Sequence, residues 1–169
     1  MGDVFKEQIV KRQSTAKDMA IRVCLVIAVI IVFFISFGII GEFGVLITAA
    51  AAFGAYYLIS FSKVEYEYIF TNGELDIDAI YNRSRRKRMF SSHVNDFEIM
   101  AHIDDQNHAG AFKSAEVVKD FSSGTSGADT YVFLINKNSK RMKVIIEPND
   151  KMLSAISGIM SRTKLHTKK

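Results

Sequence analysis

The 169-residue chain contains one cysteine, one proline and no tryptophan. Because Cys24 is the sole cysteine, no disulfide can form within the chain, as is usual for proteins of a reducing cytoplasm. Two common catalytic signatures are also missing. The sequence has neither a Gly-x-Ser-x-Gly nucleophile elbow nor a phosphate-cradling glycine motif of the Walker type. These absences predict a protein that is not an enzyme and holds no cofactor.

Charge is scarce over one long stretch of the chain. Residues 23–61 hold a single formal charge, which lies in the tetrapeptide Gly41-Glu42-Phe43-Gly44. The two apolar flanks are residues 23–40 and 45–61, and a helix of the first length measures about 27 Å, close to the thickness of the hydrocarbon core. The pattern predicts a transmembrane helical hairpin over residues 23–62. Its spans have no central acidic or basic residue, which argues against an ion or proton pathway.

Two other interpretations of the apolar stretch fit less well. A secretory signal peptide has a shorter apolar core and a cleavage site, whereas here about twenty mostly polar residues come first and a second apolar run follows at once. A buried helical pair of a soluble protein rarely continues for 18 residues without a charge.

Positive charges are absent from the loop between the two apolar runs and are concentrated beyond their outer ends. After the second run come Lys63 and the basic residues within 83–88, and before the first run come Lys6, Lys11, Arg12, Lys17 and Arg22. The positive-inside rule therefore predicts a multi-pass protein of the cell membrane with both termini in the cytoplasm.

Small residues are concentrated in the middle of the second apolar run. Ala50 and Gly54 are four positions apart and therefore share one helix face. Small residues let helix backbones approach closely in lipid. This face is predicted either to seat the first helix of the hairpin or to contact another copy of the protein.

The segments outside the hairpin differ in composition. Residues 1–22 are a cytoplasmic N-terminal segment, which forms either a frayed tail or a short interfacial helix with the apolar stripe Val4, Phe5 and Ile9. Residues 63–161 provide enough chain for one small domain with its own core. Residues 162–169 form a basic tail.

Alternating apolar and polar residues predict β-strands after the hairpin. The clearest strands are residues 64–71 and 74–81, which are joined by Asn72-Gly73, the strongest short hairpin signal. A second hairpin is predicted from residues 130–136 and 141–147. Weaker strand signals cover residues 89–94, 97–103 and 115–121.

The period of the apolar pattern changes near the C-terminus. Apolar residues recur at helical spacing from Met152 to Met160, after a start signal in which Asn149 or Asp150 would be the N-cap. The predicted fold class is therefore α+β. A transmembrane helical hairpin is followed by an antiparallel β-barrel or sandwich of about seven strands, which a C-terminal α-helix caps.

This order of strands and one closing helix resembles the pleckstrin-homology-like (PH-like) barrel. Residues 66–77, the basic run and Phe97-Glu98-Ile99 resemble the opening of bacterial membrane-anchored PH-like domains, which follow closely on a pair of transmembrane helices. Residues 4–17 and 64–99 also resemble a family of small two-span bacterial membrane proteins of unassigned function. The resemblance implies a fold and a topology, and it transfers no catalytic residue. Conventional phosphoinositide-binding PH domains use basic residues in the first hairpin turn, and here that turn is uncharged.

A basic run follows the second predicted strand. The first strand would run outward from Lys63 for about 26 Å, and the tight turn would send the second strand back toward the membrane. Five cations would then meet anionic lipid headgroups, each contributing about 1 kcal/mol near the surface. They are Arg83, Arg85, Arg86, Lys87 and Arg88. A solvated turn that obeys the positive-inside rule is the alternative.

No nucleic-acid binding is expected, because the patch is short, its neighbours are acidic and no base-stacking motif is present.

One further cluster has some metal-ligand character: His102, Asp104, Asp105 and His108. Its spacing fits no established pattern, so no metal site is predicted.

The predicted function is a membrane-anchored PH-like binding or scaffold module that docks on anionic lipid. Its partners would be the bilayer, another membrane protein or a second copy. The alternatives are an accessory subunit of a membrane enzyme or transport complex, and a self-assembling structural membrane protein.

Overall fold

The computed structural model describes residues 4–161 and 163–166. The chain divides into two compact units. We name them the helical unit, Ser14–Val64 with Tyr81–Arg85, and the β unit, Met1–Gln13 with Glu65–Ile80 and Arg86–Lys169. Each unit is coherent in itself, and each is described in turn.

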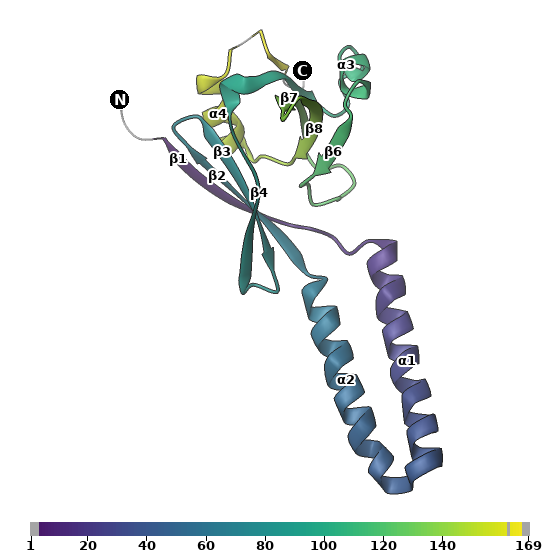
Figure 1. Ribbon diagram of the computed structural model, residues 1–169. Helices are drawn as coiled ribbons and strands as arrows, with labels where there is room; N and C mark the ends of the chain where they lie inside the picture. The colour runs from purple at the N-terminus through teal and green to yellow at the C-terminus, as the bar shows by residue number, and fades with distance from the viewer. Residues whose placement is uncertain (1–3, 162, 167–169) are drawn as a thin grey trace. The chain divides into compact units, whose positions relative to one another are not determined.

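The helical unit contains two antiparallel helices, α1 (Ala16–Ile40) and α2 (Gly44–Phe61), joined by the short helix η1 (Gly41–Phe43) (Figure 1). A capping box starts α1: the Thr15 hydroxyl accepts from the Asp18 amide at 3.3 Å, and the Asp18 carboxylate accepts from the Thr15 amide at 2.9 Å. Among the described residues, one segment is long and apolar enough to cross a membrane. This candidate span is Ala16–Phe61. An 18-residue stretch within it has a mean hydropathy of 3.3, and 6% of the residues in that stretch are buried.

The two helices contact each other along small side chains near the loop. Gly44 is buried against α1, where an added Cβ would lie 2.6 Å from the backbone carbon of Ser36. The Ser36 hydroxyl donates to the Val32 carbonyl at 2.6 Å, and it lies 3.4 Å from the Thr48 hydroxyl. Further along α2, Ala51 continues the partly buried face. The contact line therefore starts at the tight loop and repeats every three to four residues.

Ala50 and Gly54, which were predicted to share a packing face, do not seat the first helix. Both are exposed, and a Cβ added to Gly54 would meet nothing within 4 Å. The loop explains the difference, because it fixes Gly44 against Ser36 and so determines which face of α2 points toward α1. Contact between copies through Ala50 and Gly54 stays a prediction.

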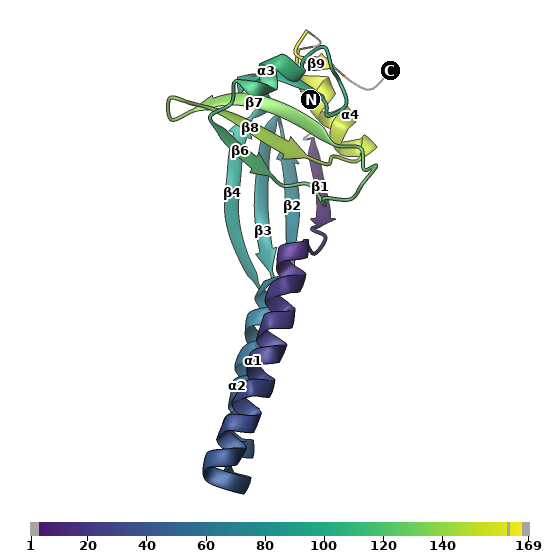
Figure 2. The same cartoon turned by 90° about the vertical axis from the view of Figure 1, so that its right-hand side faces the viewer.

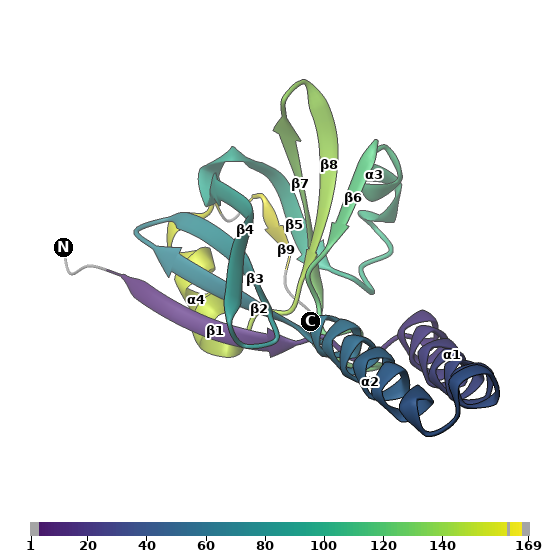
Figure 3. The same cartoon turned by 60° about the horizontal axis from the view of Figure 1, so that its bottom comes forward.

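Over its described residues, the β unit consists of two sheets and three short helical segments (Figure 3). The first sheet has the order β1-β2-β3-β4, with β1 Phe5–Lys11, β2 Val64–Thr71, β3 Glu74–Tyr81 and β4 Arg85–His93. The second has the order β6-β8-β7-β5-β9, with β5 Phe97–His102, β6 Val117–Asp120, β7 Tyr131–Lys137, β8 Lys140–Ile146 and β9 Leu165–His166. The helical segments are η2 Val94–Asp96, α3 Ala109–Lys113 and α4 Asp150–Ile159. The strands predicted over residues 64–71 and 74–81 are confirmed at both ends.

The core of the β unit is formed by the inner faces of both sheets. In the first sheet Phe70 and Leu75 are fully buried, and in the second Phe97 stacks on Phe133 with ring centroids 3.9 Å apart. The hydroxyl of Tyr68 joins two distant segments, because it donates to the Phe121 carbonyl at 2.6 Å and accepts from the Glu147 amide at 3.2 Å. Two sheets enclosing one apolar core are the arrangement expected of an α+β, PH-like domain.

The helix α4 closes the β unit and lies beside β1 (Figure 2). It buries Met152 and Ile156 on one face, as the helical spacing predicts. Its N-cap is Asn149, whose side chain accepts from the Met152 amide at 2.8 Å. The apolar face of α4 therefore packs on the core and shields it from solvent.

The N-terminal segment differs from its prediction, because Phe5–Lys11 forms a strand instead of an interfacial helix or a frayed tail. β1 pairs antiparallel with β2, with Val10 opposite Tyr66. Val10 is buried while Ile9 is about half exposed, which is a period of two. The side-chain amide of Gln8 also connects β1 to the start of α4. Its Nε2 donates to the Glu147 carbonyl, and its Oε1 accepts from the backbone amide of Asn149, both at 2.8 Å.

The position of β1 changes the domain boundaries. The helices α1 and α2 form an insertion between two neighbouring strands, β1 and β2, so the domain begins before the hairpin rather than at residue 63. At the other end, β9 pairs in parallel with β5, beyond the predicted limit at residue 161. Residues 162 and 167–169 of the predicted basic tail lie outside the described residues.

Candidate functional site

The turn between β3 and β4 lies at the C-terminal end of α2, within the helical unit. The Asn82 amide donates to the Lys63 carbonyl at 3.1 Å, and the Ser84 amide closes the turn on the Tyr81 carbonyl at 3.1 Å. Asn82 and Arg83 have left-handed backbone, with φ values of +48° and +55°. The turn therefore presents Arg83 beside the end of α2.

Two further basic groups gather at this end of the helical unit. The guanidinium carbon of Arg85 lies 5.9 Å from the ring centroid of Phe61, which is a cation–π distance. From α1, Arg22 donates to the hydroxyls of Ser62 at 3.2 Å and Ser14 at 3.0 Å. The helix α1 thus contributes a cation to the same place as the β3–β4 turn.

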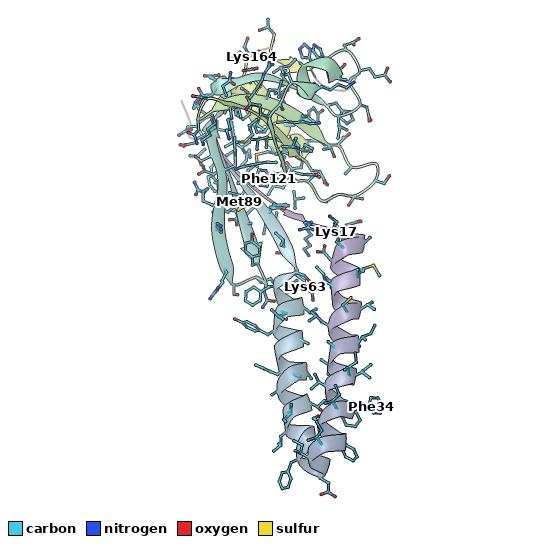
Figure 4. All side chains as sticks on the ribbon, turned by 45° about the vertical axis from the view of Figure 1, so that its right-hand side comes forward. Lys17, Phe34, Lys63, Met89, Phe121 and Lys164 are labelled. Atoms are coloured by element: carbon cyan, nitrogen blue, oxygen red, sulfur yellow. The ribbon has the colours of Figure 1, made fainter. Side chains whose placement is uncertain are left out.

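We name this group of cations the basic collar: Lys17, Arg22, Lys63, Arg83 and Arg85. Figure 4 shows Lys17 and Lys63 at the same end of the helical pair, with Phe34 toward the other. The far loop carries only an acidic group, Glu42. The helical unit is therefore electrostatically asymmetric along its length.

Aromatic side chains accompany the basic collar. Tyr57 and Phe61 make an edge-to-face contact with centroids 4.7 Å apart, and Tyr56 and Tyr57 are both largely exposed. Aromatic rings next to cations, at the end of an apolar helix, are typical of a membrane–water interface.

The other members of the basic run lie in the β unit, in strand β4 rather than in a turn. Both Nη atoms of Arg86 bind the Glu67 carboxylate, at 2.7 and 2.9 Å. Arg88 pairs with Asp76 at 2.8 Å and also with Asp78. The Glu67 and Asp78 side chains are only 3% and 7% exposed, so these two arginines neutralise buried carboxylates.

The five predicted headgroup ligands are therefore divided by the structure. Arg83 and Arg85 belong to the helical unit, whereas Arg86, Lys87 and Arg88 belong to the β unit. Lys87 is exposed. The sequence contains a signal for this division. Acidic residues alternate along β2 and β3, and ion pairs commonly form between such acidic residues and basic residues on other strands of the same sheet.

Burial raises the pKa of Glu67 above its ordinary value of 4.5. The guanidinium of Arg86 opposes this shift, and the neighbouring carboxylate of Glu7 adds to it. The folded chain therefore binds a proton at Glu67 more tightly than the unfolded chain does.

We expect the Glu67→Gln substitution to remove a pH dependence of stability. A carboxyl whose pKa is raised by folding makes the free energy of unfolding decrease as pH rises from about 4.5 through the folded-state pKa. The free energy of unfolding is measured by urea titration between pH 4 and pH 7. The value for the wild-type protein minus the value for Glu67→Gln should decrease over this range. The matched control is Glu116→Gln at an exposed position. A difference that stays constant, or rises with pH, would contradict the assignment.

The predicted His–Asp cluster is only partly brought together. His108 lies 2.8 Å from the Asp105 carboxylate and stacks on His166 with centroids 4.0 Å apart. The hydrogen bond from His108 lowers the pKa of Asp105. His102 is buried in β5, where its Nδ1 accepts from the Asp104 amide at 3.2 Å. Over residues 4–161 and 163–166, no group of three such side chains is arranged to hold a metal ion.

The two sheets and the closing helix α4 define a PH-like domain. A family model described as bacterial PH-like domain (DUF6106) matches residues 2–165, and the chain belongs to this family. No curated protein and no solved structure matches the chain. The match extends from before β1 into β9 and so includes the residues of α1 and α2.

Proposed function

We propose that this protein is a membrane-anchored PH-like binding module that works without catalysis at the inner face of the bacterial membrane. Its helical pair crosses the bilayer twice, and the basic collar contacts anionic headgroups. The observation that carries the proposal is that cations from α1, from the end of α2 and from the β3–β4 turn gather at one end of the helical unit.

The lengths of the two helices support a double crossing. With 25 and 18 residues, they measure about 37 and 27 Å, and the hydrocarbon core is about 30 Å thick. The three-residue η1 leaves no room for a domain on the far side. Their lipid-facing surface is apolar, with Ile39 and Leu46 largely exposed.

The charge asymmetry supports a cytoplasmic position of both termini. Lys17 and Arg22 lie in the first two turns of α1, Lys63 follows α2, and Glu42 is the one charged residue of the loop. Each cation near an anionic surface contributes about 1 kcal/mol of attraction. Arg86 and Arg88 contribute less to this attraction than their charges suggest, because their partners are Glu67, Asp76 and Asp78.

We expect the double variant Arg83→Gln with Arg85→Gln to weaken the preference of the full-length protein for anionic lipid. The measurement is electron paramagnetic resonance of spin-labelled phosphatidylglycerol and phosphatidylcholine, with the protein in phosphatidylcholine nanodiscs. The wild-type protein should select the anionic lipid, and each lost charge should reduce the selection by up to about fivefold.

The matched control for this experiment is Lys113→Gln with Lys151→Gln, which removes the same charge at exposed positions of the β unit. Its lipid selection should equal that of the wild-type protein. Unchanged selection in the arginine variant, or an equal loss in the lysine variant, would reject the basic collar as a lipid site.

A further inference from the structure

A second cationic site lies in the β unit, along the edge of the first sheet. β4 is the last strand of that sheet. The Met89 carbonyl accepts from the Lys119 ammonium at 3.1 Å, and the Ser91 carbonyl accepts from the Lys137 ammonium at 2.6 Å. Lys119 comes from β6 and Lys137 from the end of β7, so two lysines of the second sheet bind one edge of the first.

The spacing of these lysines suits a shared ligand. Carbonyls two residues apart on a strand point the same way and are separated by about 7 Å. Each ammonium carries three N–H donors and uses one of them on β4. The remaining N–H donors of Lys119 and Lys137 are therefore available to bind one ligand placed between the two ammonium groups.

The charges of the two lysines differ from that of Arg88 in being unpaired among the described residues. Within the described part of the chain, no ion pair joins Lys119 or Lys137 to a carboxylate. Arg88 also lies here, but Asp76 and Asp78 offset its charge. Glu74 and Asp96 line an adjacent hollow to which Lys137 also contributes. Their carboxylates accept from the hydroxyls of Ser91 at 3.4 Å and Ser92 at 3.3 Å.

A cavity of about 270 Å³ lies between these groups. Its lining includes Arg88, Phe90, Lys119, Lys137, Asn138 and Met142, and we name it the lysine pocket. The Lys137 ammonium lies 5.4 Å from the ring centroid of Phe90, so the wall is apolar below the charges. Pockets for drug-sized ligands start at about 300 Å³, so the lysine pocket suits a smaller group.

We propose that the lysine pocket binds a phosphate group, carried either by a free phosphate or phosphomonoester or by a lipid headgroup. Two ammonium groups match the double charge of a phosphomonoester, and lysine binds phosphate as a point charge. The apolar wall of Phe90 and Met142 accommodates the carbon atoms next to the phosphate. This site is independent of the basic collar, since all of its residues belong to the β unit.

The first test locates binding on the wild-type, full-length protein in phosphatidylcholine nanodiscs. Inorganic phosphate is titrated at constant ionic strength against acetate, and the amide signals are followed by NMR. The expected shifts are confined to residues 89–91, 119 and 137. A second arm replaces part of the phosphatidylcholine with phosphatidylglycerol and adds no free phosphate. Shifts at these residues in the first arm identify free phosphate as the source, and shifts in the second arm alone identify the headgroup. No shift in either arm overturns the proposal.

The second test measures affinity by calorimetry, with the probe to which the wild-type protein responds. Lys119→Met with Lys137→Met should weaken binding by about tenfold or more for each lysine, as expected for a charge-assisted hydrogen bond. Lys113→Met with Lys151→Met removes the same charge elsewhere and should bind like the wild-type protein. Equal weakening by both pairs would overturn the proposal. If the first pair fails to fold, the wild-type NMR result decides. With inorganic phosphate as the probe, Arg83→Gln with Arg85→Gln should leave binding unchanged, which separates failure of this site from failure of the basic collar.

Discussion

Gly44→Val will push the two helices apart, whereas Gly54→Val will leave their contact unchanged. A Cβ at position 44 would lie 2.6 Å from the Ser36 backbone carbon and 2.7 Å from the Phe37 nitrogen, where ordinary contacts begin at 3.4 Å. Backbone atoms cannot rotate away as a side chain can, so the helices must separate by close to 1 Å. Overpacking of this kind costs about 1–3 kcal/mol, and the Ser36–Thr48 contact is lost in addition.

The measurement is the distance between spin labels on Cys24 of α1 and on Leu58→Cys of α2, both of which are exposed positions. The wild-type protein should give one narrow distribution, and Gly44→Val a longer and broader one. Gly54→Val is the matched control, because it makes the same substitution in the same helix where a Cβ meets nothing within 4 Å. Equal distributions for the wild-type protein and Gly44→Val would show that this close contact is not needed.

Gly54→Val also distinguishes two roles of the small-residue face. If copies of the protein contact each other through Ala50 and Gly54, the variant will abolish their association while the distance within the hairpin is kept. If the face touches only lipid, the oligomeric state measured in mild detergent will be the same as in the wild-type protein. The two readouts are independent, since the contact within the hairpin starts at Gly44.

The features that the sequence predicts well are those with local causes. Asn72-Gly73 reverses the chain between two strands of clear alternation, and both strands end where the pattern ends. Asn149 caps α4 because its side chain reaches an amide three residues away. Such signals need only a few neighbouring residues to be interpreted.

The features that differ from the prediction have non-local causes. The basic run is mostly strand because Arg86 and Arg88 are held by Glu67 and Asp78, 19 and 10 residues earlier. Their role as ion-pair partners can be read only once the register between strands is known. Likewise, several small residues of α2 could face α1, and the geometry of the loop selects Gly44 rather than Gly54.

The candidate site illustrates the same limit. Arg83 and Arg85 were identified from charge alone, together with Arg86, Lys87 and Arg88, and composition cannot separate exposed cations from paired ones. The lysine pocket gave no signal, because Lys119 and Lys137 are 18 positions apart in the sequence and meet only at the edge of β4.

Val10→Asn will strongly destabilise the β unit, whereas Ile9→Asn will have little effect. Val10 is 5% exposed and lies opposite Tyr66, on the core face of the first sheet. A buried amide there loses apolar contacts and lacks a hydrogen-bond partner, at a cost of about 3 kcal/mol. Ile9 is 51% exposed on the other face, and surface substitutions change stability by about 0.5 kcal/mol. The measurement is urea unfolding of the full-length protein in nanodiscs, followed by the near-ultraviolet signal of its tyrosines.

This pair of adjacent positions separates the strand from the interfacial helix expected for residues 1–22. In such a helix Ile9 would belong to the apolar stripe with Val4 and Phe5, so Ile9→Asn would be the more damaging change. In a frayed tail both variants would equal the wild-type protein. Only a strand, in which successive side chains point to opposite faces, makes Val10→Asn costly and its neighbour tolerant. The same result would establish that residues on both sides of the helical pair stabilise one sheet, because β1 and β2 pair with each other although α1 and α2 lie between them in the sequence.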